Sequence, residues 1–258
     1  MFAALLVAAL SLPLAGKTVA IDPGHNGGNA SHPREINRLV NAGTLWKPCD
    51  AVGASTASDY SEAAYNLDVS LRLARILRAK GARVVLTRTT NNGWGPCITE
   101  RAAIGNRADA DAAISIHADG GPTSGRGFHV IYPPSIRGLT DDIAVPSHRL
   151  ALDIRDAYRA GTAMPYSTYT GRAGLAVRSD LGGLNLSDVP KVFIETGNMR
   201  NSVDVGFLTS PRFRARAAKA LATGLQRFLL RSSLSRRIGR VDFSADTVDA
   251  AAVNRLTR

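Results

Sequence analysis

The sequence predicts an α/β fold: a single domain with a twisted, mostly parallel sheet flanked by helices on both faces. Short apolar runs rich in β-branched residues, as buried parallel strands require, alternate along the chain with longer stretches of helical periodicity. The length of 258 residues and the hydrophobic share of 45% suit one globular domain with a sizeable core. Alternating strands and helices predict right-handed crossovers between parallel strands.

The elements follow one another in a regular order. The strands expected from the runs TVAID, RVVLT, AAISI, GFHVIY and KVFIE cover residues 18–22, 83–87, 112–116, 127–132 and 191–195. Between the first two strands, residues 61–82 form a helix with Leu67, Leu71, Ala74 and Leu77 on one face. Further helices are expected over residues 98–110, 145–160 and 212–230.

Two long irregular stretches and the two ends depart from this pattern. Residues 26–60 and about 165–190 are too long for simple connections, and loops of that size are usually functional. Residues 1–16 are typical of a secretory leader, although a buried first helix is the alternative. We therefore expect an exported protein, in the periplasm, the cell wall or outside the cell. Its catalytic domain would cover residues 17–230 and its basic polar tail residues 231–258.

The net charge of +11 predicts attraction to anionic partners. From Arg212 to Arg240 the chain has eight arginines, one lysine and no acidic residue. This segment is either a solvated helix face followed by a tail or a means of retention on an anionic cell-wall polymer. Nucleic acid is not an expected partner, because the leader and the lack of aromatics among these arginines disfavour it. We expect a monomer.

The chain has two cysteines, Cys49 and Cys97, in loops that each contain Gly or Pro and a Trp. In an exported protein they predict a disulfide, worth about 4 kcal/mol in the loop-entropy model. Two unrelated thiols are the alternative. A zinc site built on these cysteines is disfavoured, because neither has a CxxC neighbour.

Polar residues stand at or just past the ends of three predicted strands. His25 follows VAID, His117 follows AISI, and Glu195 closes KVFI. Ligands of open parallel sheets bind beyond the carboxyl ends of the strands. Two histidines and a carboxylate at such ends predict a metal site or an acid–base site. A catalytic zinc takes three protein ligands, and its hydrolytic chemistry needs a further carboxylate as base.

The residue pattern leaves the fourth member open. Glu35, Asp59, Glu62 and Glu100 are the candidate acids. Glu62 opens a helix, where the dipole favours its anion, but an ordinary first-turn acid has the same appearance. Asp22 either orients a ligand histidine or forms the turn before the Pro-Gly pair that follows it.

The remaining histidines and the glycine-rich segments receive no catalytic role. We expect His129 to pack or to face solvent from mid-strand, His148 to lie in the first turn of a helix, and His32 to lie in the long loop. DPGHNGG and SIHADGG lack the patterns of phosphate-binding loops, so their glycines are expected to let the backbone pass close to a metal and substrate.

Four blocks occur in a specific order: AIDPGHNG, SEAAYNLDVSLRLARILRAKGARVVLTR, ERAAIGNRADADAAISIHAD and VFIETGNMRN. Together they resemble the zinc-dependent N-acetylmuramoyl-L-alanine amidases of the amidase-3 family, in particular the single-domain mycobacterial-type peptidoglycan amidases. The resemblance covers about Thr18 to Leu230. It implies that His25, Glu62 and His117 bind one Zn²⁺ and that Glu195 is the catalytic carboxylate.

The resemblance also implies the substrate, peptidoglycan or its muropeptide fragments, and a chain without a separate wall-binding module. The family's last block carries a hydrophobic pair before Ser-Asn where this chain reads TGNMRN, and Asn198 and Asn201 are its predicted substrate contacts. Two other functions stay open: a zinc carboxypeptidase-type peptide hydrolase on a similar sheet, and a non-catalytic cell-wall-binding module that has kept the fold.

Overall fold

The computed structural model describes residues 12–242, with side chains described for residues 12–232. Its centre is a six-stranded sheet of order β4-β1-β5-β8-β6-β7. The strands are β1 (Thr18–Pro23), β4 (Arg83–Leu86), β5 (Ala112–Asp119), β6 (His129–Tyr132), β7 (Leu175–Val177) and β8 (Lys191–Asn198). All neighbouring pairs are parallel except β6 with β8. The predicted α/β fold with a mostly parallel sheet is therefore confirmed.

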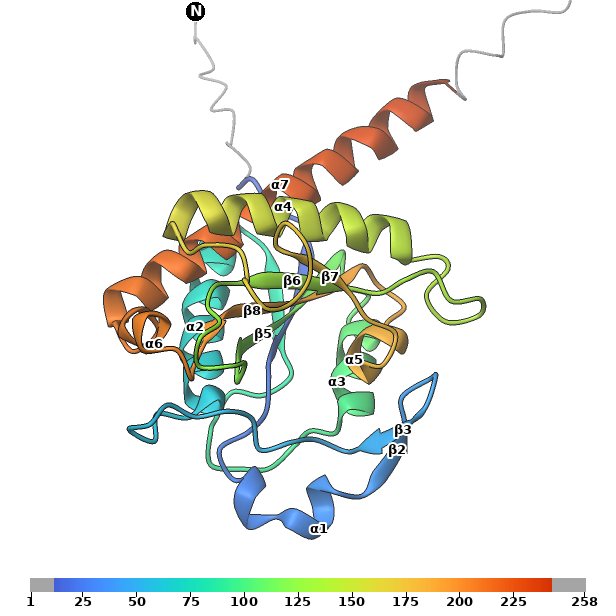
Figure 1. Cartoon of the computed structure of the whole chain (residues 1–258). Helices are drawn as coiled ribbons and strands as arrows, with labels where there is room; N and C mark the ends of the chain where they lie inside the picture. Colours follow the sequence, from blue (N-terminus) through green and yellow to red (C-terminus); the bar gives the residue numbers. More distant parts are fainter. Residues whose placement is uncertain (1–11, 243–258) are drawn as a thin grey trace, which may run out of the picture.

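Helices cover both faces of the sheet (Figure 1). The first face carries α2 (Glu62–Ala79), α4 (Ala144–Thr162) and α7 (Pro211–Asp242), which pack against one another and against β5 and β6. The second face carries α3 (Ile98–Arg107) and α5 (Gly182–Asn185), next to β1 and β8. A short helix, α6 (Ser202–Leu208), follows β8. Because two helices cover it only in part, the second face leaves room for a site.

The long segment between β1 and α2 is structured. It contains the 3₁₀ turn η1 (Asn29–Ser31), α1 (Pro33–Ile36), and the antiparallel pair β2 (Leu39–Asn41) and β3 (Trp46–Pro48). The expectation of an irregular stretch over residues 26–60 is therefore wrong for this part. These short elements lie beyond the strand ends, beside α3 and α5 (Figure 1).

Helix α2 buries only part of the predicted face. Ala74 and Leu77 are fully buried, as expected, whereas Leu71 is 38% exposed. The buried side also includes the polar residues Glu62 and Asn66. The apolar pattern is misleading in the first half of α2, because the inward face there borders a polar site instead of the hydrophobic core.

Both predicted domain boundaries differ from the folded unit. Leu14 is fully buried in the main core, and its N–H donates to the Lys80 carbonyl at 2.9 Å, so the domain includes residues before the expected start at 17. Of the leader predicted over residues 1–16, residues 1–11 lie outside the described residues. At the other end α7 continues to Asp242, because residues 231–242 contain helix formers and no proline. Within residues 12–242 no helix is long and apolar enough to cross a membrane.

Candidate metal and acid–base site

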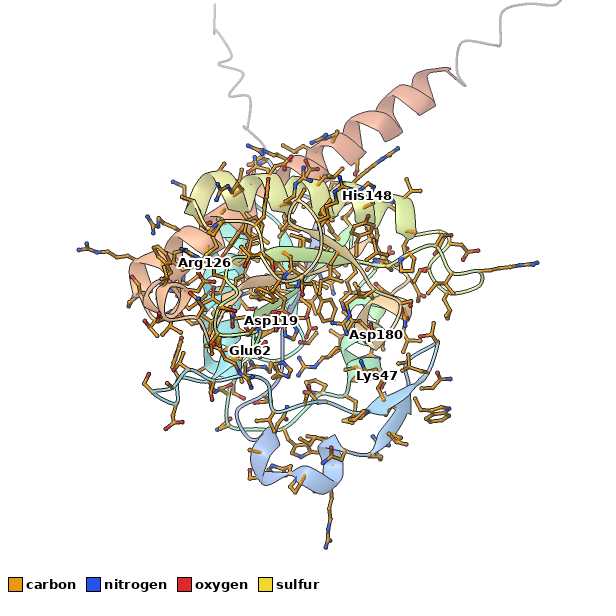
Figure 2. The ribbon with its side chains drawn as sticks, in the orientation of Figure 1. Lys47, Glu62, Asp119, Arg126, His148 and Asp180 are labelled. Carbon is orange, nitrogen blue, oxygen red and sulfur yellow. A yellow bond between two sulfur atoms is a disulfide. The ribbon has the colours of Figure 1, made fainter. Side chains whose placement is uncertain are left out.

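Three of the predicted residues meet at the carboxyl ends of the central strands. His25 follows β1, and His117 lies near the end of β5. Glu62, labelled in Figure 2, is the first residue of α2. One ligand atom from each lies within 4.8 Å of those of the others. Ser61 fixes the start of α2, because its side chain accepts a hydrogen bond from the Ala64 N–H at 3.2 Å. The helix start therefore sets the position of the Glu62 carboxylate.

The breakers around His25 have a structural reason. His25 itself has a φ of 56°, in the left-handed region that few side chains adopt, so the chain turns sharply after β1. A Cβ atom on Gly24 would lie 2.1 Å from Cε1 of His117. A Cβ atom on Gly53 would lie 2.7 Å from Cδ2 of His25. Glycine at both positions makes room for the two imidazole rings.

Hydrogen bonds orient both rings toward Glu62. Nδ1 of His25 donates to the carbonyl of Ala51 at 2.9 Å, which leaves Nε2 at 3.3 Å from Oε1 of Glu62. Nε2 of His117 lies 3.2 Å from Oγ of Ser115, and its Nδ1 lies 2.9 Å from the same Glu62 oxygen. When both rings are neutral and the outer nitrogens are the donors, the two inner nitrogens present lone pairs to one point.

Glu62 is buried, and its carboxylate is held by the backbone. The N–H groups of Ala54 and Ala118 donate to its two oxygens at 2.7 and 3.2 Å. Burial raises the pKa of Glu62, but His25 and His117 outweigh it and hold the pKa well below its usual range. Burial likewise opposes the charge on His25, but Glu62 and Asp50 raise its pKa to about 10. The site therefore strongly favours a positive charge beside the carboxylate.

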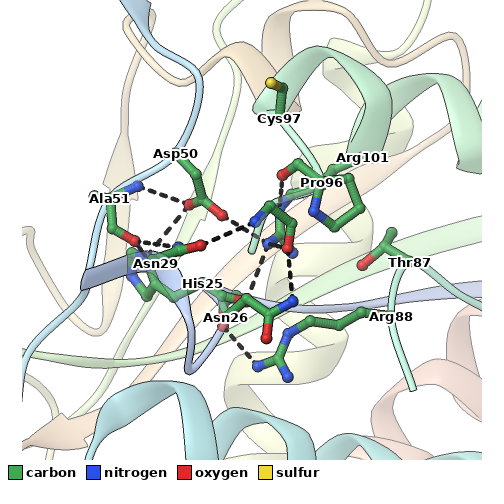
Figure 3. Close-up of polar contacts among 12 residues, drawn as sticks. His25, Asn26, Asn29, Asp50, Ala51, Thr87, Arg88, Pro96, Cys97 and Arg101 are labelled. Carbon is green, nitrogen blue, oxygen red and sulfur yellow. Dashed lines mark hydrogen bonds and ion pairs between the residues drawn. The ribbon is translucent and has the colours of Figure 1, made fainter. Parts of the chain in front are cut away.

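Asp22, Asp50 and Arg101 form a buried ion cluster behind the histidines. Nη1 of Arg101 lies 2.7 Å from Asp22 and Nη2 lies 2.9 Å from Asp50. Asp50 reaches Nδ1 of His25 at 3.5 Å, and the close-up in Figure 3 shows these residues together with Arg101. Burial alone would raise the pKa of Asp22, but Arg101 and other partners hold it well below its usual range. Both carboxylates are therefore anionic.

Asp22 also reaches the second histidine. Oγ of Ser115 donates to Asp22 at 2.7 Å and accepts from His117. Of its two predicted roles, orientation of a histidine is the one that its contacts support. The sequence reasoning missed Asp50, Ser115 and Arg101. The predicted disulfide was the available signal for Asp50 and Arg101, because Asp50 follows Cys49 directly and Arg101 lies in the helix that begins after Cys97.

Cys49 and Cys97 form the expected disulfide, across a separation of 48 residues. Cys49 directly precedes Asp50. Cys97 directly precedes helix α3, and α3 carries Arg101. The bond therefore joins the two segments that supply the ion cluster.

Glu195 lies beside the three residues without joining them. It is the register partner of His117 across β5 and β8, so both side chains point to the same face. Its Oε2 atom is buried and has no hydrogen-bond partner among the described residues. Burial, then Glu62 and Asp119, raise the pKa of Glu195 well above its usual range. The arrangement thus pairs an anionic carboxylate, Glu62, with one that holds its proton.

The other candidates lie elsewhere. Of the four candidate acids, Glu62 is the one at the site, whereas Asp59 and Glu100 are exposed. Asn198 is buried and donates to the carbonyls of Pro122 and Gly125. Asn201 caps α6, and its amide donates to Thr123. Both asparagines hold the chain's own loops, so their contact with substrate stays a prediction.

The remaining histidines pack against aromatic rings. His32 stacks on Trp94 with ring centroids 6.1 Å apart, and His148 stacks on Tyr132 at 4.7 Å. His129 is buried in β6, in line with the expectation that it packs.

A pocket of about 480 Å³ opens at the histidines. Its walls are mainly apolar and include Ile36, Val52, Leu181 and Phe193. The Phe193 ring stacks on His117 with centroids 5.1 Å apart.

A second hollow, of about 610 Å³, is lined by hydroxyl groups and Arg200. Gly120 lies between Arg200 and Ala54, because a Cβ on Gly120 would lie 3.0 Å from Ala54 and 3.6 Å from Nε of Arg200.

The fold and the site define an α/β protein with a His₂Glu set suited to a divalent metal and a separate buried carboxyl oxygen on Glu195. The profile of the family described as Amidase_3, N-acetylmuramoyl-L-alanine amidase, matches residues 19–227. The chain belongs to this family. The resemblance seen in the sequence blocks is thus confirmed.

Individual relatives agree with the family assignment. The N-acetylmuramoyl-L-alanine amidase Rv3717 of Mycobacterium tuberculosis is 43% identical over 218 residues, which cover 84% of this chain and 88% of the relative. The crystal structure of the amidase Ami1 from Mycobacterium smegmatis superposes with a TM-score of 0.78 at 41% identity, covering 84% of this chain and 98% of that one. The crystal structure of apo Ami1 from Mycobacterium abscessus superposes with a TM-score of 0.77 at 41% identity, covering 83% of this chain and 99% of that one.

Proposed function

We propose that the chain hydrolyses the amide bond between N-acetylmuramic acid and L-alanine in peptidoglycan or its muropeptides. In this proposal one Zn²⁺ is held by His25, Glu62 and His117, and Glu195 is the general base. The observation that carries the proposal is the convergence of two oriented imidazole nitrogens and one carboxylate oxygen within 4.8 Å. Membership of the amidase family supports the choice of bond.

The residues fit zinc by their chemistry. Two neutral imidazole nitrogens and one carboxylate oxygen form a ligand set typical of catalytic zinc, which keeps a further position open. The hydrogen bonds from His25 to Ala51 and from His117 to Ser115 set the tautomers that metal binding needs. When bound in such a site, zinc polarises a carbonyl group and lowers the pKa of water to about 7.

Glu195 moves the protons of the reaction. Its raised pKa has the negative charge of Glu62 as one cause, so Glu195 loses its proton more readily once a cation balances that charge. As a carboxylate it takes a proton from the water that attacks the lactyl carbonyl carbon. It then delivers this proton to the nitrogen of L-alanine as the C–N bond breaks. The products are the lactyl carboxylate and a stem peptide with a free amine.

The two hollows offer room for both parts of the substrate. The apolar pocket beside Phe193 suits the sugar ring and its methyl groups, since apolar walls bind such surfaces. Arg200 in the second hollow suits a carboxylate of the stem peptide. The alternative occupation, with the peptide in the apolar pocket, is tested by the Arg200 variant described below.

The proposal includes export. The disulfide Cys49–Cys97 supports an oxidising compartment, where the peptidoglycan substrate also lies. A leader would then end before Leu14, because this residue belongs to the core. The basic helix α7 would add attraction to an anionic cell-wall polymer.

The experiment compares three substrates with zinc-loaded protein: a muropeptide, the matching free stem peptide and intact peptidoglycan. Mass spectrometry identifies the products. The proposal predicts an intact stem peptide with a free L-alanine amine from the muropeptide and no cleavage of the free peptide. Cleavage of the free peptide would support a carboxypeptidase-type hydrolase instead. Binding to peptidoglycan without any hydrolysis would support a wall-binding module.

A further inference from the structure

His129, to which the sequence assigned no role, lies next to Glu195. Strand β8 runs between β5 and β6, and Glu195 is the register partner of His117 on one side and of His129 on the other. Register partners point to the same face of a sheet, with Cβ atoms about 4.5–5.5 Å apart. The three side chains therefore form a row in which His129 and Glu195 are direct neighbours without a hydrogen bond between them.

Both neighbours carry a buried polar atom without a partner. His129 is 2% exposed, and its Nδ1 has no hydrogen bond to any described residue. The same holds for Oε2 of Glu195. Buried polar groups are rarely left without a hydrogen bond, and each such unpaired group in a native structure calls for an explanation. Two unpaired atoms on adjacent residues, one able to donate and one able to accept, complement each other.

Tyr169 fixes the other side of His129. The two rings meet edge to face with centroids 6.2 Å apart, and the Tyr169 hydroxyl donates to Asp119 at 3.0 Å. The Tyr169 ring fits because Gly121 and Gly125 carry no side chain, since Cβ atoms there would lie 2.6 and 2.5 Å from it. The long segment before β7 thus brings a ring that limits the movement of His129.

The imidazole of His129 is neutral at neutral pH. Burial lowers the pKa of His129 to about 4. Asp119 raises this pKa in part, and Arg178 lowers it slightly. A neutral imidazole donates from one nitrogen and accepts at the other, so it can bond to a carboxylate or to a carboxylic acid. It adds no charge that would compete for a metal beside Glu62.

We propose that His129 is a positioning residue for Glu195. A rotation of the two side chains lets Nδ1–H of His129 donate to Oε2 of Glu195, and the other carboxyl oxygen is left to exchange the proton with water and with the leaving nitrogen. The inference rests on the proposed function in that Glu195 is taken as the general base. It assigns His129 no contact with substrate and no part in holding zinc.

The test compares two variants that differ in hydrogen bonding. His129→Leu removes the donor, whereas His129→Asn keeps an N–H close to the position of Nδ1. A hydrogen bond to a charged group of this kind changes a rate by about 10–100-fold, so kcat of His129→Leu should fall by that factor. KM and zinc content should stay at the wild-type values, and His129→Asn should recover most of the activity. His148→Leu, the same change at an exposed histidine, is the matched control and should behave as wild type.

A double-mutant comparison separates positioning from packing. In the Glu195→Ala background, His129→Leu should cause no further loss of kcat, because there is no carboxyl group left to position. An equal loss in both backgrounds would overturn the proposal, and so would equal losses for His129→Leu and His129→Asn.

Nitrogen NMR gives a readout that needs no activity. With five histidines in the chain, the imidazole ¹⁵N signals can be assigned. The Nδ1 signal of His129 should shift between wild type and Glu195→Ala, and an unchanged signal would contradict the contact. If the protein cleaves no muropeptide while this shift is seen, the proposed function fails and the contact stands.

Discussion

Replacing Gly24 by alanine should remove zinc binding while leaving the fold in place. The new Cβ would lie 2.1, 2.3 and 2.6 Å from Cε1, Nε2 and Nδ1 of His117, whereas ordinary contact begins at 3.4 Å. The ring would have to retreat by roughly 1.3 Å, the difference between 3.4 and 2.1 Å. Phe193, stacked on the ring at 5.1 Å, restricts this movement.

A displacement of this size exceeds what a metal site accepts, since ligands must be held within about 0.5 Å. Changes to groups that orient ligands weaken metal binding by about 10–100-fold, and we expect Gly24→Ala to lose at least this factor in zinc affinity. Because the substitution displaces the ring of His117, a proposed zinc ligand, hydrolytic activity should decrease in proportion to the zinc content.

The assay is competition for zinc against a chromophoric chelator, together with a thermal melt of the metal-free protein. Gly206→Ala is the matched control, because a Cβ on Gly206 in α6 would meet nothing within 4 Å. A zinc affinity of Gly24→Ala within about twofold of wild type would refute the reasoning, provided that the melt shows a folded protein.

Three further predictions concern charge. Arg101→Met should lower the free energy of unfolding by about 3–5 kcal/mol in urea denaturation, because it removes the guanidinium that pairs with two buried carboxylates. Arg107→Met, in an exposed ion pair, should leave the denaturation midpoint unchanged. Because the pKa of His25 is raised to about 10, zinc must displace a proton from His25 below that pH. Calorimetry in two buffers should show that zinc binding releases a proton at pH about 7, and the zinc affinity should rise with pH. A zinc affinity that falls with rising pH would contradict this prediction. Arg200→Ala should raise KM for a stem peptide with a free glutamate carboxylate and leave KM unchanged for the amidated peptide.

The central strands were predictable because burial on both faces leaves a simple signal. TVAID and AAISI coincide with the starts of β1 and β5, since a parallel strand between two helix layers needs apolar residues at every position. The inward face of α2 was predicted correctly at Ala74 and Leu77 and wrongly nearer its start, because Glu62 and Asn66 are buried by the site and not by the core. No apolar periodicity marks such residues.

The site was predictable as far as it follows strand ends. His25, His117 and Glu195 stand where parallel strands converge, so their proximity could be expected from the fold class. Glu62 was identified through the family resemblance, because a carboxylate in a first helical turn is common without any ligand.

The ion cluster behind the histidines was not predictable. Arg101 is separated from Asp50 by 51 positions in the sequence and from Asp22 by 79. Its contacts with them depend on how the segments after β1 and before α2 fold against α3. His129 was missed for a related reason: the pairing of β6 with β8 is antiparallel, and its register could not be read from the sequence.

The central claim is that zinc binding and proton transfer are carried by different carboxylates, Glu62 and Glu195. Zinc content and muropeptide hydrolysis, measured side by side for wild type, Glu195→Ala and Glu62→Ala, test it directly. The account predicts one zinc per chain in wild type and in Glu195→Ala, with hydrolysis by Glu195→Ala reduced about 10²–10⁴-fold to a residual rate, and loss of zinc in Glu62→Ala. A Glu195→Ala protein without zinc, or one that keeps wild-type hydrolysis, would contradict it.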